Sequence, residues 1–267
     1  MKINRDMGVR RFGRWNTLGL YELARREVMR FLVVWTQTLL APLATAGLFL
    51  AVFALAIGPA RGDVMGVPFL AFLAPGILMM TVIQNAFANT SSSLMIGKVQ
   101  GNIVDTLMPP LSPLELVLGY VAGGLLRGLM VAVTIAAVMH LFLGVPLVHP
   151  LWALVFAALG SILLGGLGII AAILAEKFDH MAAITNFIVT PLAFLSGTFY
   201  STDGLPEPMQ VLTHLNPIFY LIDGVRYGFI GVSDSSPWLG LAICTGAAFA
   251  TLTLCWNWFR TGFRLKP

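Results

Sequence analysis

Long apolar runs alternate with short polar stretches along this chain. Six runs stand out, at residues 33–57, 69–93, 116–143, 151–174, 181–199 and 238–259. A helix needs about 20 predominantly apolar residues to cross the hydrocarbon core of a bilayer, and each run is long enough. The pattern therefore predicts an all-α polytopic membrane protein, with a six-span transmembrane domain over residues 33–260.

The region before the first run is basic and has a helical pattern. Residues 1–32 contain eight Lys or Arg, and apolar positions recur at helical spacing from Thr17 to Phe31. This predicts a basic tail followed by an amphipathic helix lying in the membrane interface. We expect Leu18, Tyr21, Val28 and Leu32 to face lipid, and Glu22, Arg25, Arg26 and Arg30 to face water. Glu22 and Arg26 stand four residues apart and are expected to pair. The alternative is a solvated basic tail.

The connection between the second and third runs has a pattern of its own. This elbow, residues 97–115, reads GKVQGNIVDTLMPPLSPLE. A short helix starting near Gly101 is stopped by the Pro109–Pro110 pair, and Ser112 can cap a new helix. The residues expected to dock the short helix into a partner's groove are Asn102, Ile103, Val104, Asp105, Leu107 and Met108. The alternative is a structural turn on the membrane surface.

Residues 191–231 are too polar for a plain span and too aromatic for a solvated loop. Irregular backbone at membrane depth must be covered by protein or water, so we expect short re-entrant helices over 200–231, broken at Pro217. The expected helices are Leu212–Tyr220 and Ile222–Ile230. Asp223 and Arg226 would neutralise each other there. Candidates for an outer gate or an external dimer seal are Phe199, Tyr200, Phe219 and Tyr220, with packing against the spans as the alternative.

Composition and charge placement agree with a membrane protein. The chain is 58% hydrophobic and 10% charged, with a mean hydropathy of +0.86, whereas soluble domains are about 25% charged. With the N-terminus inside the cell, 13 of the 16 Lys and Arg fall on the cytoplasmic side. The positive-inside rule then predicts cytoplasmic termini, including the tail 261–267. The net charge of +4 does not indicate nucleic-acid binding, because the basic residues flank spans.

The sequence lacks the motifs of catalysis and of nucleotide binding. It has no G-x-x-x-x-G-K-[ST] phosphate loop, no G-x-S-x-G elbow and no H-E-x-x-H. We therefore expect no enzymatic activity, no catalytic residue, no metal site and no cofactor bound by this chain. Arg127 is the only charge well inside an apolar run, so ion coupling is not expected either.

Two features of the spans bear on how they meet. Gln84 and Asn85 begin a polar series in the second run, which would either line a wet path or join helices. Small residues four apart in the next runs, such as Gly119 and Gly123, allow helices to approach closely. We expect this spacing to serve packing within the chain, with a subunit contact as the alternative.

Four stretches together resemble the membrane subunits of ATP-binding-cassette (ABC) transporters of the type-2 exporter class. They are Glu22–Pro42, Ala74–Leu94, Gly101–Tyr120 and Phe194–Gly231. The class includes permeases for polysaccharide, Nod-factor and drug export, and the resemblance covers nearly the whole chain.

The resemblance implies a membrane-embedded homodimer that binds two copies of a separately encoded ATPase, which would hold ATP and Mg. The elbow would be the coupling helix, and Glu22 and Arg26 would belong to a connecting helix near the ATPase. The implied activity is ATP-driven export of a lipid-linked glycan, a lipid or a hydrophobic drug across a bacterial inner (plasma) membrane. An ATPase-independent channel or scaffold is the alternative function.

Overall fold

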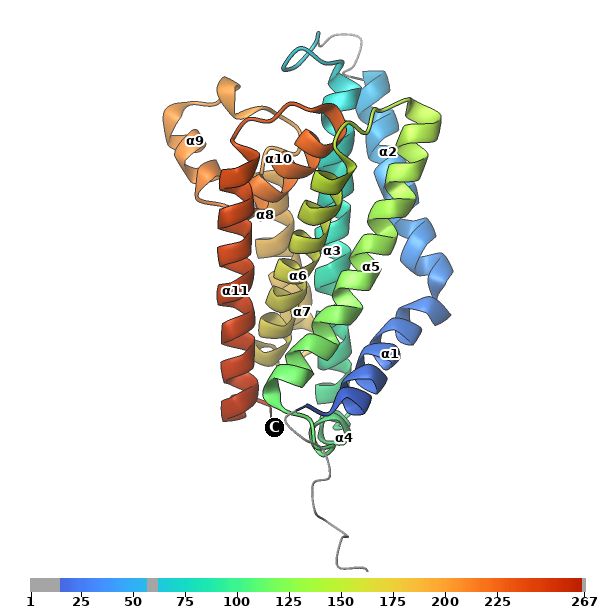
Figure 1. Cartoon of the computed structure of the whole chain (residues 1–267), viewed down its shortest axis with the longest axis vertical. Coiled ribbons are helices and arrows are strands. Elements are labelled where there is room, and N and C mark those ends of the chain that lie inside the picture. The colour runs from blue at the N-terminus through green and yellow to red at the C-terminus, as the bar shows by residue number, and fades with distance from the viewer. Residues whose placement is uncertain (1–14, 57–61, 266–267) are drawn as a thin grey trace, which may run out of the picture.

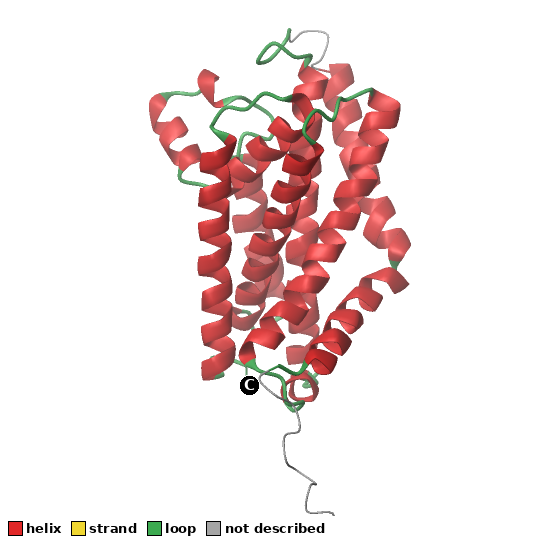
Figure 2. Cartoon of the chain, viewed as in Figure 1, coloured by secondary structure: helices red, strands yellow, loops and turns green. Residues whose placement is uncertain are grey.

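The computed structural model describes residues 15–56 and 62–265. Within these residues the regular elements are all helical and no strand forms (Figure 2). In chain order they are α1 (Thr17–Val33), a π-helical turn (Thr36–Leu40), α2 (Ala41–Ala56), α3 (Phe69–Val99), α4 (Ile103–Leu107), α5 (Pro113–Leu143), α6 (Pro150–Leu174), α7 (Phe178–Ile184), a second π-helical turn (Thr185–Val189), α8 (Thr190–Phe194), a 3₁₀ turn (Thr202–Gly204), α9 (Glu207–His214), α10 (Pro217–Ile230) and α11 (Pro237–Thr261). The all-α prediction is confirmed. The basic tail predicted before Trp15 lies outside the described residues.

The long helices form a bundle with two different ends (Figure 1). One end, called the α4 end here, holds the start of α1, the short helix α4 and the last described residues. The other, called the α9 end, holds α9 and α10. The centre of the bundle is built from α3 and α6, which are largely buried, whereas α2 and α11 are mostly exposed. A bilayer would therefore surround the outer helices while α3 stays enclosed.

In the described part of the chain, five helices are long and apolar enough to span a membrane: Thr36–Ala56, Phe69–Val99, Pro113–Leu143, Pro150–Leu174 and Pro237–Thr261. They correspond to five of the six apolar runs. Two of them, α3 and α5, extend past their runs into the elbow. The extension of α5 follows from a capping box, in which Ser112 and Glu115 bond each other's backbone.

The remaining run, 181–199, forms a shorter and less regular helix. α7, a π-helical turn and α8 together cover residues 178–194, and their 17 residues correspond to roughly 26 Å of helix. The helix widens just before Pro191, which has no N–H to donate to the preceding turn. The segment between Ala175 and Thr198 nevertheless leads from one end of α3 to the other. Ala175 lies beside Lys98, and Thr198 lies beside Gly76. The count of six spans stays a prediction.

Glycines let the helices of the bundle touch through their backbones. A Cβ atom on Gly123 of α5 would stand 2.6 Å from Cβ of Glu27 on α1, and one on Gly124 would stand 3.0 Å from Thr90 on α3. Gly128 faces Ser161 of α6 in the same way. Residues of this same chain fill the space beside these glycines, which confirms the prediction of packing within the chain.

The segment before α11 departs from its predicted helix bounds. The break at Pro217 is confirmed, but the bounds differ: the first short helix, α9, already ends at His214, and α10 runs without interruption from Pro217 to Ile230. The reason is local. Pro217 starts α10 instead of interrupting a helix, and the Asn216 side chain caps it by accepting a hydrogen bond from the Ile218 N–H at 3.0 Å. Nearly all of α10 is buried, packed against α3, α6 and α11.

Candidate functional site

The amphipathic helix α1 packs on the bundle through a face that includes a carboxylate. Its buried residues are Leu23, Glu27 and Phe31, four apart along the helix. Close contact with α5 is possible because Gly119 and Gly123 present no side chains to Leu23 and Glu27. Burying an unpaired carboxylate is costly, so Glu27 requires positive or hydrogen-bonding neighbours.

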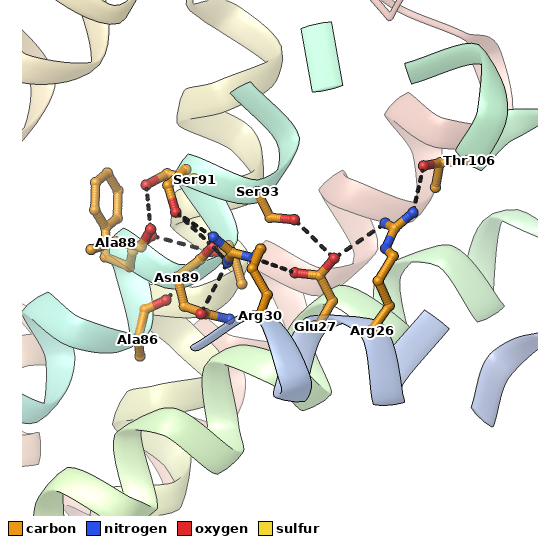
Figure 3. A network of polar contacts seen from close by, with 12 residues as sticks. Arg26, Glu27, Arg30, Ala86, Ala88, Asn89, Ser91, Ser93 and Thr106 are labelled. Carbon is orange, nitrogen blue, oxygen red and sulfur yellow. Dashed lines mark hydrogen bonds and ion pairs between the residues drawn. The ribbon is translucent and has the colours of Figure 1, made fainter. Parts of the chain in front are cut away.

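Glu27 has these neighbours on α1 and α3 (Figure 3). Its Oε1 accepts a hydrogen bond from the Ser93 hydroxyl at 2.8 Å and lies 3.2 Å from Nη2 of Arg26. Its Oε2 lies 3.6 Å from Nε of Arg30. The side chain is fully buried. One carboxylate therefore joins two arginines of α1 to a hydroxyl of α3.

Arg30 extends the contact further along α3. Its Nη2 donates to the backbone carbonyl of Asn89 at 2.6 Å and to the Asn89 side chain at 3.0 Å, and its Nη1 donates to Ser92 at 3.1 Å (Figure 3). The prediction that Arg30 faces water is wrong. The hydrogen-bonding groups of Asn89 and Ser92 draw its side chain inward, where a guanidinium can satisfy several acceptors at once.

Arg26 connects α1 to the elbow. Its Nη1 donates to the hydroxyl of Thr106 on α4 at 3.0 Å. The predicted ion pair between Glu22 and Arg26 is wrong. Glu22 lies 3.5 Å from Arg25, on the exposed side of α1, while Arg26 turns toward Glu27 and α4. We call the residues that connect α1, α3 and α4 the α1 cluster: Arg26, Glu27, Arg30, Asn89, Ser92, Ser93 and Thr106.

The short helix α4 has one buried and one exposed face. Ile103 and Thr106 are buried, so the prediction that Ile103 docks into a partner is wrong: its side chain packs into the bundle and anchors α4 there. Val104 and Met108 remain exposed at 49% and 76%, and Asp105 is also exposed. Asn102 is exposed and Leu107 is half-buried. The apolar face left open is therefore narrower than the sequence pattern predicts.

A second carboxylate ties the start of α1 to the elbow. Glu115, fully buried, accepts hydrogen bonds from the backbone N–H of Asn16 and, at 2.6 Å, from that of Ser112. Asn16 also caps α1 by accepting from the Gly19 N–H at 2.9 Å. The N-terminus of α1 and that of α5 thus share one anion, which suits the positive end of each helix dipole.

A cavity of about 430 Å³ lies beside α4 at the same end. Its walls include Ile103, Val104, Glu176 and Arg264. At one wall the Lys98 ammonium caps the C-terminus of α6, donating to three carbonyls at 2.7–3.0 Å. The elbow is thus held on one side by the α1 cluster and borders a hollow on the other.

The polar series of α3 meets α5 near the middle of the bundle. Gln84 and Asn85 are half-buried, and Nη2 of Arg127 donates to Oδ1 of Asn85 at 3.1 Å. Asn85 in turn donates to the Thr81 carbonyl of its own helix at 3.0 Å. Arg127, which lies near the middle of a candidate span, therefore sits against one of the two residues proposed for a wet path.

At the α9 end, Arg226 is fully buried among two carboxylates. Its Nη1 lies 3.6 Å from Asp223 and 3.3 Å from Asp234, and its Nη2 donates to the Gly197 carbonyl at 2.7 Å. Its guanidinium stands 3.9 Å from the ring centroid of Phe72. Asp234 escaped the sequence reasoning because eight residues and a helix end separate it from Arg226. Arg226 thereby joins α10 to the loops on both sides of it.

The predicted gate aromatics lie at the same end. Phe199 stacks on Phe53 of α2, with ring centroids 4.9 Å apart. The Tyr200 hydroxyl donates to the Leu195 carbonyl at 2.7 Å. Phe219 and Tyr220 are buried, and each packs against His214. All four contact other parts of this chain; their role as a gate stays a prediction.

The bundle of apolar helices defines a multi-pass membrane protein, and comparison with known proteins gives its family. Residues 19–230 match the ABC-2 type transporter family, so the chain belongs to this family. It is 36% identical to the inner membrane transport permease YadH of Escherichia coli K12 over 253 residues, which cover 93% of this chain and 97% of the relative. It is 27% identical to nodulation protein J of Sinorhizobium fredii over 215 residues, 79% of this chain and 80% of the relative. The chain is therefore a multi-pass transport permease of the inner membrane.

Proposed function

We propose that this chain is the permease subunit of an ATP-driven exporter and works as a homodimer with two copies of a separately encoded ATPase. The α4 end would lie in the cytoplasm. The supporting observation is the contact of Arg26 with Thr106, which joins the exposed helix α4 to the buried helix α3 through the α1 cluster. The ATPase would supply ATP and Mg, since this chain has no phosphate loop.

The position of α4 suits the transfer of movement. An ATPase that holds Val104 and Met108 would move α4, and the bonds of Arg26 would move α1 with it. Arg30 and Glu27 would pass the displacement to the enclosed helix α3. Hydrogen bonds to charged groups are short-range and directional, so such a chain transmits movement only while each bond holds.

Basic residues support the proposed orientation. Lys98 and Arg260 lie in the last turns of α3 and α11, Lys177 and Arg264 lie just outside helix ends, and all four stand at the α4 end together with the basic residues of α1. At the α9 end the described Arg226 is neutralised by carboxylates. This is the distribution that the positive-inside rule associates with a cytoplasmic face.

Co-purification with a candidate ATPase tests the proposal. The substitutions Val104→Asp and Met108→Asp place a charge on the exposed face of α4 and should prevent assembly with the ATPase. Leu215→Asp is the matched control, because Leu215 is as exposed as Met108, at 76%, but lies at the α9 end. All three variants should remain folded, as judged by size-exclusion chromatography.

The results separate the two functions that the sequence allows. Assembly that fails in the α4 variants and persists in Leu215→Asp supports an ATP-driven exporter. If the permease moves solute across vesicle membranes without any ATPase, it is instead an ATPase-independent channel. If it neither binds an ATPase nor moves solute, it is a scaffold. For the cargo, we propose a lipid-linked glycan, a lipid or a hydrophobic drug, tested by ATP-dependent export from reconstituted vesicles.

A further inference from the structure

The exposed side of α3 is polar, although α3 is the most enclosed of the candidate spans. Between residues 81 and 97 its positions are buried except on one stripe, which consists of Gln84, Asn85, Ala88, Ser92, Ser93, Ile96 and Gly97. Four of these seven carry an amide or a hydroxyl. An ordinary lipid-facing stripe would be apolar, because hydrocarbon offers no hydrogen bonds.

Gln84 shows that the stripe has unused binding capacity. It is half-buried, and within the described chain its side-chain amide has no hydrogen-bond partner. An amide at this depth is normally satisfied by protein, water or a bound molecule. Ser92 and Ser93 already bond Arg30 and Glu27 of α1, so the part of the stripe left for a polar ligand is the part around Gln84 and Asn85.

Arg127 borders this stripe from α5. It stands one residue from the middle of the 31-residue helix Pro113–Leu143, and so near the centre of a span. Apart from Asn85 its guanidinium contacts no polar partner among the described residues, and its Nε is buried without one. The charged neighbour whose field acts on it is Arg30, another cation. An intramembrane guanidinium in this position calls for an anion.

The residues that the structure describes do not supply that anion. Across the region Arg26, Arg30 and Arg127 are balanced only by Glu27. The five candidate spans contain one acidic residue, Glu115, which is held at the start of α5 by Asn16 and Ser112. A second copy of the chain brings the same spans and hence no free carboxylate at this depth. The charge is complementary to a ligand, not to a subunit.

We propose that Arg127, with Asn85 and Gln84, binds the anionic headgroup of an amphiphilic cargo, such as the phosphodiester of a phospholipid or of a lipid-linked glycan. The guanidinium supplies a forked pair of donors that matches phosphate oxygens. The two amides on α3 supply further donors beside it. This inference deepens the proposed export function and rests on it, because the polar stripe would be the wall along which the cargo headgroup moves.

Lipid binding to the purified full-length permease tests the site without knowledge of the natural cargo. Native mass spectrometry in detergent measures binding of phosphatidylglycerol, which is anionic, and of phosphatidylethanolamine with the same acyl chains, which is zwitterionic. Wild type should bind phosphatidylglycerol about tenfold more tightly at one site. Arg127→Gln should abolish this preference, and Arg127→Lys should keep most of it. Arg25→Gln, on the exposed side of α1, is the control and should leave the preference unchanged.

A competition arm separates the two sources of phosphate. If millimolar inorganic phosphate displaces phosphatidylglycerol from wild type, the site accepts the free anion; if it does not, the acyl chains are needed as well. Equal binding of the two lipids by wild type, or an undiminished preference in Arg127→Gln, overturns the proposal. Should Arg127→Gln fail to fold, loss of the preference in the charge-keeping Arg127→Lys variant overturns it too.

Failure of the anion site is distinguishable from failure of the export proposal. Arg127 is far along α5 from the elbow, so Arg127→Gln should still co-purify with the ATPase that wild type binds. If wild type shows no lipid preference but still binds the ATPase, only the anion site is refuted and the export function stands. Absence of any ATPase complex in wild type refutes the export function regardless of the lipid result.

Discussion

Arg26 of α1 donates a hydrogen bond to the hydroxyl of Thr106 on α4 at 3.0 Å, although 80 residues separate them. This contact is the point where the elbow meets the rest of the α1 cluster. Because Arg26 also contacts Glu27, which accepts from Ser93, side chains in contact connect α4 to α3; under the proposed function a displacement of α4 would follow this connection.

Thr106→Val keeps the shape of the side chain and removes the acceptor of Arg26. Arg26 is half exposed and can turn to water, so the free energy of unfolding should fall by only about 1 kcal/mol. In the assembled transporter ATP hydrolysis should continue while the amount exported per ATP falls. Thr253→Val, whose exposed hydroxyl bonds only its own helix at Phe249, should change neither. Normal export per ATP in Thr106→Val would refute transmission through this bond.

Glu27→Ala should destabilise the protein strongly. It removes the carboxylate that faces Arg30 and Arg26 and leaves a guanidinium partly buried without its counter-ion. Breaking a buried pair from one side costs about 3–5 kcal/mol. Glu22→Ala removes an exposed partner of Arg25 and should cost less than about 1 kcal/mol. Thermal unfolding of the two variants in detergent gives the comparison, and similar melting temperatures would contradict it.

Gly123→Ala should push α1 away from α5. The added Cβ would stand 2.6 Å from Cβ of Glu27 and 3.0 Å from the Asn89 amide. Overpacking of this kind costs about 1–3 kcal/mol. Gly246→Ala in α11 is the control, since nothing lies within 4 Å of the position of its Cβ; alanine in a helix interior should stabilise it by about 0.5–1 kcal/mol. Opposite shifts in melting temperature are expected, and a shift of the same sign would count against the contact.

Arg226→Gln should loosen the α9 end. It leaves Asp223 and Asp234 buried without their shared cation and the Gly197 carbonyl without its donor. A loss of about 3–5 kcal/mol is expected. Adding Asp234→Asn should recover part of the loss, because it removes one of the two uncompensated charges. Hydrogen exchange at α10 measures the loosening, and unchanged protection would rule out this role of Arg226.

Local rules predicted the elements well. Proline and serine placed the start of α5, proline pairs ended α4, and the length of the apolar runs located five spans. The same rules located the break at Pro217 but misplaced the helix bounds on both sides of it, because the Asn216 cap was not considered. The shortness of the 178–194 helix also escaped them, since composition does not reveal a π-helical turn.

The partners of individual side chains were harder to predict from the sequence than the helices were. The i,i+4 rule paired Glu22 with Arg26, and amphipathicity placed Arg30 in water, yet both arginines turn inward. The rule considers one helix alone. In the bundle the arginines meet Glu27 on the buried face of α1, and Asn89 and Thr106 on α3 and α4, which the rule does not include.

The sequence by itself determined that this is an all-α membrane protein, where most helices begin and end, and that the elbow carries a short helix, because hydrophobic run length and capping act over a few residues. Only the tertiary structure decided that Glu27 and Arg30 join α1 to α3, that Ile103 is an anchor, that Asp234 completes the surroundings of Arg226, and that Arg127 has no acidic partner among the described residues. The contacts of α1 with α3 join groups up to 66 residues apart, and their energies exist only once helix packing has brought the groups together and removed water from between them.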